Sequence, residues 1–283
     1  MTNLEEAVEK IELEWLGRTV HTVRFPRDGE CKGTVLILHG LGDHIGRYGW
    51  AVKLLHEHEF DVLGIDWPGG GQSSGIRGDL PLVDDACRLV EEVLETLNVS
   101  PVGVLGHSTG GFFLTHCLAK RLSRLASLRW VWFSSPLLDP SYRQNPLKIA
   151  TAKVLAKLFP TFTLSTGVSP RDCFHTLGDP VKREFAEGVH DRISLRFGQD
   201  LLDPTKKAEL FAPEIDPDLS LLITQGADDH VCPPAMSELF LRSFKGEDTT
   251  FLIFAGARHE PFREPENSGF FNHVRTWMSN RDS

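Results

Sequence analysis

Short apolar runs alternate with longer amphipathic segments along most of this chain. Six apolar runs have the length and composition of buried strands. They cover residues 35–38, 62–65, 102–106, 130–133, 221–224 and 251–254. Residues 84–97 and 270–278 instead repeat their apolar positions at helical spacing, which predicts helices with one buried face. Such alternation predicts an α/β protein with a mostly parallel central sheet and helices on both of its faces.

Two stretches depart from this alternation. Residues 12–25 read as two short strands around Gly17 and Arg18, which predicts an antiparallel hairpin at one edge of the sheet. Residues 139–217 show no convincing strand pattern and two helix patterns, at 146–159 and 180–188. We therefore expect a core formed by 1–138 and 218–283, with 139–217 inserted as a helical cap. This cap segment is expected over the carboxyl ends of the strands, where open α/β sheets bind ligands.

Composition excludes several classes of protein. The 283 residues are 41% hydrophobic and carry a formal net charge of −9, which argues against nucleic acid as the main partner. The apolar runs are too short for a membrane-spanning helix, and the acidic N-terminus lacks the features of a secretory signal. The five cysteines are spaced singly, so neither a zinc site nor a disulfide framework is expected. These features predict a cytoplasmic protein that needs no metal or organic cofactor.

The sharpest local motif is Gly106-His107-Ser108-Thr109-Gly110, which fits the G-x-S-x-G pattern of a nucleophile elbow. In an elbow, a strained turn between a strand and a helix exposes the serine, and the flanking glycines avoid clashes. An expected strand precedes the motif and an expected helix follows it. Ser108 is therefore the candidate nucleophile.

A serine nucleophile needs a base and an acid that orients the base, and in this architecture the chain order is Ser, acid, His. Two late strands end in suitable loops. The first leads into Asp228 and Asp229, and the spacing alone does not choose between them. The second leads into His259, the candidate base.

The oxyanion of an acyl-transfer reaction needs backbone N–H donors. Thr109, directly after the nucleophile, and Leu41, in the loop after the first parallel strand, are the candidates. The glycines around Leu41 also approximate a dinucleotide-binding fingerprint, but the third glycine falls one place late, so this alternative is weak.

Together these motifs resemble the α/β-hydrolase fold, and within it the monoacylglycerol lipase and lysophospholipase-like group. The resemblance covers residues 15–280 in order. It rests on five stretches, namely HGLGDHIGRY (39–48), DWPGGGQSSG (66–75), GHSTGG (106–111), GADDHVCPP (226–234) and GARHE (256–260). In that group's pattern the acid stands three residues after the glycine, which selects Asp229. The last stretch, GARHE, resembles the group's G-x-x-H-E, which selects His259. The chain has Asp43, Gly70 and Thr109 where the group usually has Glu, His and Met.

The resemblance implies a serine hydrolase that cleaves esters of monoacyl lipids, monoacylglycerols first, through an acyl-enzyme. Lysophospholipids and short- or medium-chain esters are alternative substrates, and a binding or signalling protein of low turnover is a more distant alternative. Within the cap segment, Leu147, Val154 and Leu158 form an apolar stripe. Either this stripe packs on the core, or it binds substrate at a mouth that touches a micelle or membrane, which would place the protein at the membrane periphery.

Overall fold

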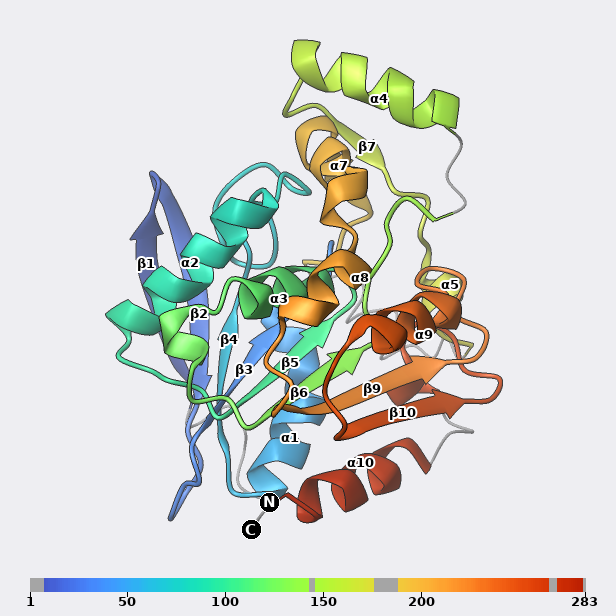
Figure 1. Cartoon of the computed structure of the whole chain (residues 1–283). Coiled ribbons are helices and arrows are strands. Elements are labelled where there is room, and N and C mark those ends of the chain that lie inside the picture. The colour runs from blue at the N-terminus through green and yellow to red at the C-terminus, as the bar shows by residue number, and fades with distance from the viewer. Residues whose placement is uncertain (1–7, 143–145, 176–187, 265–268, 282–283) are drawn as a thin grey trace.

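Eight strands form the central sheet of the computed structural model, which describes residues 8–142, 146–175, 188–264 and 269–281. Their order is β1-β2-β4-β3-β5-β6-β9-β10 (Figure 1). The strands are β1 (Glu9–Trp15), β2 (Arg18–Phe25), β3 (Thr34–Leu38), β4 (Asp61–Ile65), β5 (Gly103–His107), β6 (Trp130–Ser134), β9 (Ser220–Gly226) and β10 (Thr249–Phe254). All neighbours from β4 to β10 pair in parallel. The predicted mostly parallel sheet is confirmed.

The predicted hairpin forms one edge of this sheet. Strands β1 and β2 pair antiparallel, with Trp15 opposite Arg18, and β2 continues the sheet against β4. The two residues between them, Leu16 and Gly17, both have positive φ, at 48° and 72°. Two consecutive residues with positive φ give the turn that matches the twist of a tight hairpin.

Helices cover both faces of the sheet. One face carries α1 (Gly49–Glu57) and α10 (Gly269–Ser279), and the other carries α2 (Val83–Thr96), α3 (Thr109–Ala119), α8 (Ala208–Phe211) and α9 (Pro234–Ser243). Side chains of β3 alternate between the two layers, because successive strand residues point to opposite faces of the sheet. Leu36 and Leu38 lie in the α2–α3 layer, whereas Val35 and Ile37 lie in the α1–α10 layer.

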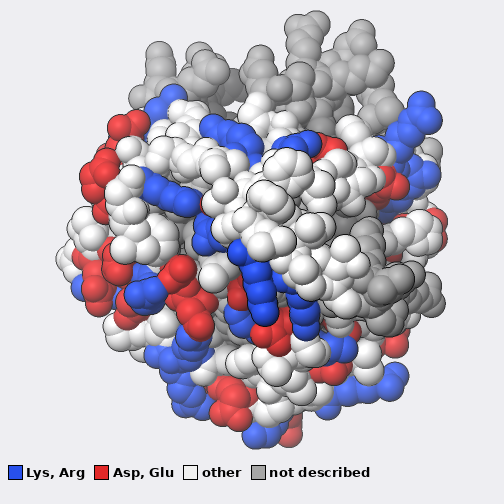
Figure 2. Space-filling view, turned by 90° about the horizontal axis from the view of Figure 1, so that it is seen from above, with Lys and Arg blue, Asp and Glu red and all other residues white. Residues whose placement is uncertain are grey.

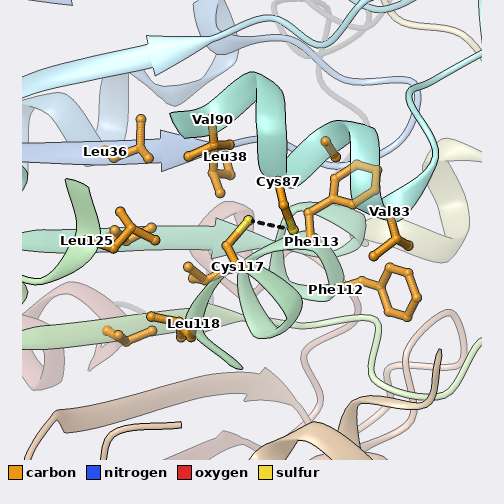
Figure 3. Packing of buried hydrophobic residues seen from close by; sticks show 14 of the residues in the cluster. Leu36, Leu38, Val83, Cys87, Val90, Phe112, Phe113, Cys117, Leu118 and Leu125 are labelled. Carbon is orange, nitrogen blue, oxygen red and sulfur yellow. Dashed lines mark hydrogen bonds between the residues drawn. The ribbon is translucent and has the colours of Figure 1, made fainter. Parts of the chain in front are cut away.

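The layer that contains α2 and α3 fixes the helix that follows Ser108, which is α3. Figure 3 shows Phe113 and Phe112 of α3 beside Cys87 and Val83 of α2, with Leu36 and Leu38 of β3 near Val90 in the same cluster. The thiols of Cys87 and Cys117 meet at this contact with a sulfur–sulfur distance of 3.3 Å, as free cysteines joined by a hydrogen bond. Dense packing of this kind leaves α3 little freedom to move relative to the sheet.

The cap segment contains strands that the sequence did not predict. Its described elements include α4 (Pro146–Leu158), β7 (Thr163–Ser165), α5 (Pro170–Cys173), β8 (Arg192–Ser194) and α7 (Leu195–Leu201), and α8, which packs on the core, follows them. β7 and β8 form a small antiparallel sheet of their own, so the expectation of no strand between 139 and 217 was wrong. Three residues per strand are too few to produce a readable alternation. The helix expected at 146–159 is α4, whereas the one expected at 180–188 falls almost entirely outside the described residues.

Helix α7 joins this segment to the core. Arg196 of α7 donates from Nε and Nη2 to Asp79, at 2.6 and 2.8 Å, and Asp200 accepts from the backbone N–H of Val83 at 2.9 Å. The Asp79 side chain is fully buried and also pairs with Arg18 of β2. Helix α4 packs on α7 and lies farther from the sheet (Figure 1). Within the described part of the chain, no helix is long and apolar enough to span a membrane.

Candidate active site

Ser108 stands between β5 and α3 in a strained conformation. Its φ and ψ are 51° and −119°, a region that residues with a side chain rarely occupy. Gly110, two residues after Ser108, permits this turn to pack on the sheet, since a Cβ there would lie 2.0 Å from the carbonyl oxygen of Leu38. The motif's geometry is therefore that of an elbow, with the serine at its apex.

Asp229 and His259 come together from the loops after β9 and β10. Nδ1 of His259 lies 2.9 Å from Oδ2 of Asp229, and both side chains are buried. The other carboxylate oxygen of Asp229 accepts from the N–H groups of Val231 and Cys232, at 2.9 and 2.8 Å. Asp228 is exposed. The tertiary structure thus gives Asp229, not its neighbour, the contact with His259.

The pair raises the basicity of the histidine. Burial by itself lowers the pKa of His259, because it removes the imidazolium from water. The charge of Asp229 and the hydrogen bond to it outweigh burial, so the pKa of His259 lies above its ordinary value of 6.5. A histidine in this state accepts a proton readily and is stabilised once it carries one.

Two other buried histidines remain neutral beside this pair. Burial, together with the charge of His259, whose ring centroid is 5.1 Å away, lowers the pKa of His107 to about 3. Burial also lowers the pKa of His39, whose Nε2 accepts from the backbone N–H of Trp67. His230, beside the acid, is exposed. Of these histidines, His259 is the one that pairs with Asp229.

Ser108 and His259 line one cavity of about 400 Å³. Leu41 and Thr109 line it too, so the structure brings both candidate oxyanion residues to the cavity that contains the serine. The loop that carries Leu41 passes close to the nucleophile, since a Cβ on Gly40 would lie 3.1 Å from Cβ of Ser108. Backbone N–H groups of this loop are accordingly within reach of an atom bonded to the serine.

A second cavity of about 730 Å³ adjoins the first beneath the cap segment. Residues lining both cavities are Leu137, Thr166, Leu201 and Val231. Much of the remaining lining is apolar and comes from α7 and from the loop before α9, as with Leu202 and Pro233. The shared residues place the two cavities next to each other, with the second one against α7 and the loop before α9.

A buried charge network that the sequence did not single out closes the other side of the first cavity. Arg47 donates to Asp43 at 2.7 Å and to both oxygens of Glu260 at 3.1 Å. Burial alone raises the pKa of Asp43, but the charge of Arg47 outweighs burial and holds it well below its ordinary value. Arg47 and Glu260 lie in the HGLGDHIGRY and GARHE stretches, whose resemblance to the family could have marked both residues as part of the site. Their pairing ties the loop after β3 to the loop that carries His259.

The predicted substrate-binding stripe on α4 is outward-facing where it is described. Val154 and Leu158 are 61% and 65% exposed and line neither cavity. The side chain of Leu147 lies outside the described residues. From α4 it is Ala152 that lines the second cavity. The two described stripe residues therefore do not pack on the core.

Within the described ranges, no group of three or more His, Cys, Asp and Glu side chains is arranged to hold a metal ion.

The chain is similar to several known hydrolases. It matches the family model described as serine aminopeptidase, S33, over residues 29–266. A monoglyceride lipase of Rattus norvegicus is 27% identical over 270 residues, which cover 89% of this chain and 84% of that protein. The crystal structure of Paleococcus ferrophilus monoacylglycerol lipase is 33% identical with a TM-score of 0.80, over 93% of this chain and 99% of that one.

One further relative is much longer. An uncharacterized abhydrolase domain-containing protein of Dictyostelium discoideum is 28% identical over 251 residues. The match covers 88% of this chain but 26% of that protein.

Proposed function

This chain belongs to the serine aminopeptidase S33 family and has the α/β-hydrolase fold, and on that premise we propose that it is a serine hydrolase of monoacyl lipid esters, with monoacylglycerols as its main substrates. The observation that carries the proposal is the buried His259–Asp229 pair, whose histidine lines the same cavity as Ser108 at the elbow. The relatives named as monoglyceride lipases support the choice of substrate.

The proposed reaction proceeds through an acyl-enzyme. Oγ of Ser108 attacks the ester carbonyl while His259 takes its proton, and His259 then protonates the departing glycerol oxygen. Water, deprotonated by His259, cleaves the acyl-enzyme and releases the fatty acid. Asp229 keeps Nδ1 of His259 protonated and stabilises the imidazolium. In both steps the N–H groups of Leu41 and Thr109 hold the oxyanion.

The two cavities suit the two halves of such a substrate. The larger one has an apolar wall between α7 and α9 and would take the acyl chain, since burial of each CH₂ contributes about 0.8 kcal/mol. The smaller one contains Ser108 and, among a mainly apolar lining, the polar side chains of Arg47, His190 and Asp191, which would bind the glycerol hydroxyls. Residues 139–217 would accordingly act as a cap that encloses the acyl chain.

The outer surface of the cap segment suits contact with a lipid surface. Seven exposed apolar side chains lie within 15 residues of sequence, namely Val154, Leu155, Leu158, Phe159, Phe162, Leu164 and Val168. Leu164 and Val168 also line the cavities, whereas the other five line neither cavity. Residues 140–171 contain Lys and Arg but no Asp or Glu, although the chain as a whole carries a net charge of −9. Seen from above, Figure 2 shows basic side chains crossing a largely uncharged surface. We propose transient docking of this face on a membrane or micelle, and the expected cytoplasmic location remains a prediction.

Labelling and a substrate panel together test the proposal. A fluorophosphonate probe should label wild-type protein at Ser108 and should not label Ser108→Ala. Unlabelled wild-type enzyme should hydrolyse monoacylglycerols faster than lysophospholipids, p-nitrophenyl butyrate or aminoacyl amides at matched concentration. Absence of labelling would reject a serine hydrolase, whereas labelling with a preference for another substrate would replace the substrate class alone.

A further inference from the structure

A glutamine beneath the Asp229–His259 pair contacts the carboxylate from the side opposite its backbone donors. Gln225 is the penultimate residue of β9 and is fully buried. Its Nε2 donates to Oδ2 of Asp229 at 3.1 Å and also to the carbonyl oxygen of Cys232. That same Oδ2 accepts the hydrogen bond from His259. Gln225 therefore shares one acceptor atom with the imidazole.

The orientation of the Gln225 amide follows from its partners. Nε2 faces two groups that can only accept, a carboxylate and a carbonyl, so the nitrogen belongs on that side. On the other side, Oγ of Ser237 donates to Oε1 of Gln225 at 2.6 Å. Ser237 lies on α9 and is fully buried. A chain of hydrogen bonds thus runs from α9 through Gln225 to Asp229 and His259.

We propose that Gln225, oriented by Ser237, is a positioning residue that holds the Asp229 carboxylate in line with His259. The inference rests on the role of Asp229 in the proposed function. The N–H groups of Val231 and Cys232 hold one oxygen of the carboxylate, and Gln225 holds the other. Because both oxygens are held, these contacts oppose rotation of the carboxylate away from Nδ1 of His259.

Removal of the Gln225 donor has two expected consequences. The carboxylate gains rotational freedom, which lowers the rate because fewer molecules hold His259 in the productive orientation. Its negative charge is also less well satisfied, so it stabilises protonated His259 more strongly. Since only neutral His259 can act as the base, the acid limb of the kcat/KM profile should move to higher pH.

Other titratable or charged groups face His259 from neighbouring elements and must stay unchanged in the test. They are His107 at the end of β5, Asp43 and Arg47 from the loop after β3, and Glu260 beside it in sequence. None is a direct hydrogen-bond partner of Gln225 in the contacts described above. A shift of the acid limb in a Gln225 variant therefore reports the Asp229 contact.

The test variant is Gln225→Met, which keeps the length of the side chain and removes its donor. Loss of a hydrogen bond to a charged group should lower kcat/KM about 10- to 100-fold. The acid limb should shift upward, and the downfield NMR signal of the proton between His259 and Asp229 should move. Ser237→Ala, which leaves the amide in place but unoriented, should give a smaller loss with shifts in the same direction.

A matched control is available on the same strand. Thr224 is equally buried, points to the opposite face of the sheet and accepts a hydrogen bond from Nε1 of Trp132 at 2.9 Å. Thr224→Val should lower the melting temperature while it leaves the acid limb and the NMR signal in place. It therefore measures what loss of a buried hydrogen bond does when the contact with Asp229 is intact.

The outcomes separate this inference from the proposed function. If Gln225→Met and Ser237→Ala keep the wild-type profile, or lose activity only in step with their melting temperature as Thr224→Val does, the positioning role is wrong. Should Gln225→Met fail to fold, Ser237→Ala alone decides by the same criteria. Fluorophosphonate labelling of wild-type Ser108 is run alongside, because its absence would overturn the proposed function itself.

Discussion

The elbow around Ser108 and helix α4 of the cap segment are held in place by opposite kinds of contact. Every residue of β5 is buried, and the glycine after Ser108 touches the backbone of β3 so closely that a Cβ would clash. Helix α4 packs on α7 and leaves Val154 and Leu158 more than half exposed. Helix α7 itself is joined to the core by ion pairs such as Arg196–Asp79.

This difference divides the proposed function between the two regions. Close-packed backbone allows one arrangement of the nucleophile, as transition-state stabilisation requires. An exposed helix resting on another cap helix can be altered without disturbing that arrangement, so it can set how substrate arrives. Changes at the elbow should therefore remove catalysis on every substrate, and changes on α4 should depend on the physical form of the substrate.

Replacement of the nucleophile should have the largest effect. Ser108→Ala should lower kcat by about 10⁶-fold on all esters, because the attacking oxygen is gone. The melting temperature should stay close to that of wild type, since alanine fits the same turn. Steady-state kinetics and thermal unfolding check this. A clean preparation that kept more than about 1% of wild-type activity would rule out Ser108 as the nucleophile.

Loss of the orienting acid should come next. Asp229→Asn should lower kcat by about 10⁴-fold, because the amide stabilises the wrong tautomer of His259 and cannot stabilise its charged form. Asp228→Asn, the matched neighbour, should stay within about twofold of wild type, since this side chain is exposed. The reverse ranking in kcat measurements would show that the wrong aspartate has been assigned.

The acid limb of the kcat/KM profile should follow the protonation of His259 alone. Its raised pKa places the midpoint of the acid limb of kcat/KM above pH 6.5. Below that midpoint the base is protonated, so activity should fall about tenfold for each further pH unit. Buried His107, with a pKa of about 3, stays neutral throughout this range. Rate profiles between pH 5 and 9 check the prediction, and a midpoint below 6.5 contradicts the strong pairing with Asp229.

The smallest effect is expected from substitutions on α4, and unlike those at the elbow it should depend on the physical form of the substrate. Replacing Val154 and Leu158 together by Ser removes exposed apolar surface that would otherwise enter a lipid interface. We expect a several-fold loss of kcat/KM on micellar long-chain monoacylglycerol and little change on soluble butyrate esters, with an unchanged melting temperature. Equal fractional losses on the two substrates would reject the lipid-contact interpretation of this face.

Much of the fold was predictable because it depends on local patterns. The six strand runs, the edge hairpin and the helices at 84–97 and 270–278 all appear near their predicted positions. Strands β7 and β8 were missed because three-residue strands leave no periodic signal. The stripe on α4 was visible in sequence, but its direction was not, because an apolar face indicates burial only when another surface covers it.

The sequence by itself determined the strand–helix alternation, the elbow and the order of its candidate partners, because each depends on neighbours a few residues apart. The family resemblance already selected Asp229, and the tertiary structure shows its contact with His259. Only the tertiary structure decided that Arg47 reaches Glu260 across 213 positions and that Gln225 contacts the carboxylate of Asp229. The His259–Asp229 and Arg47–Glu260 contacts join loops after different strands, and only the sheet order determines which of these loops lie close together. The physical reason is that hydrophobic patterns specify which face of an element is buried, whereas polar contacts between loops depend on distances that only the assembled sheet establishes.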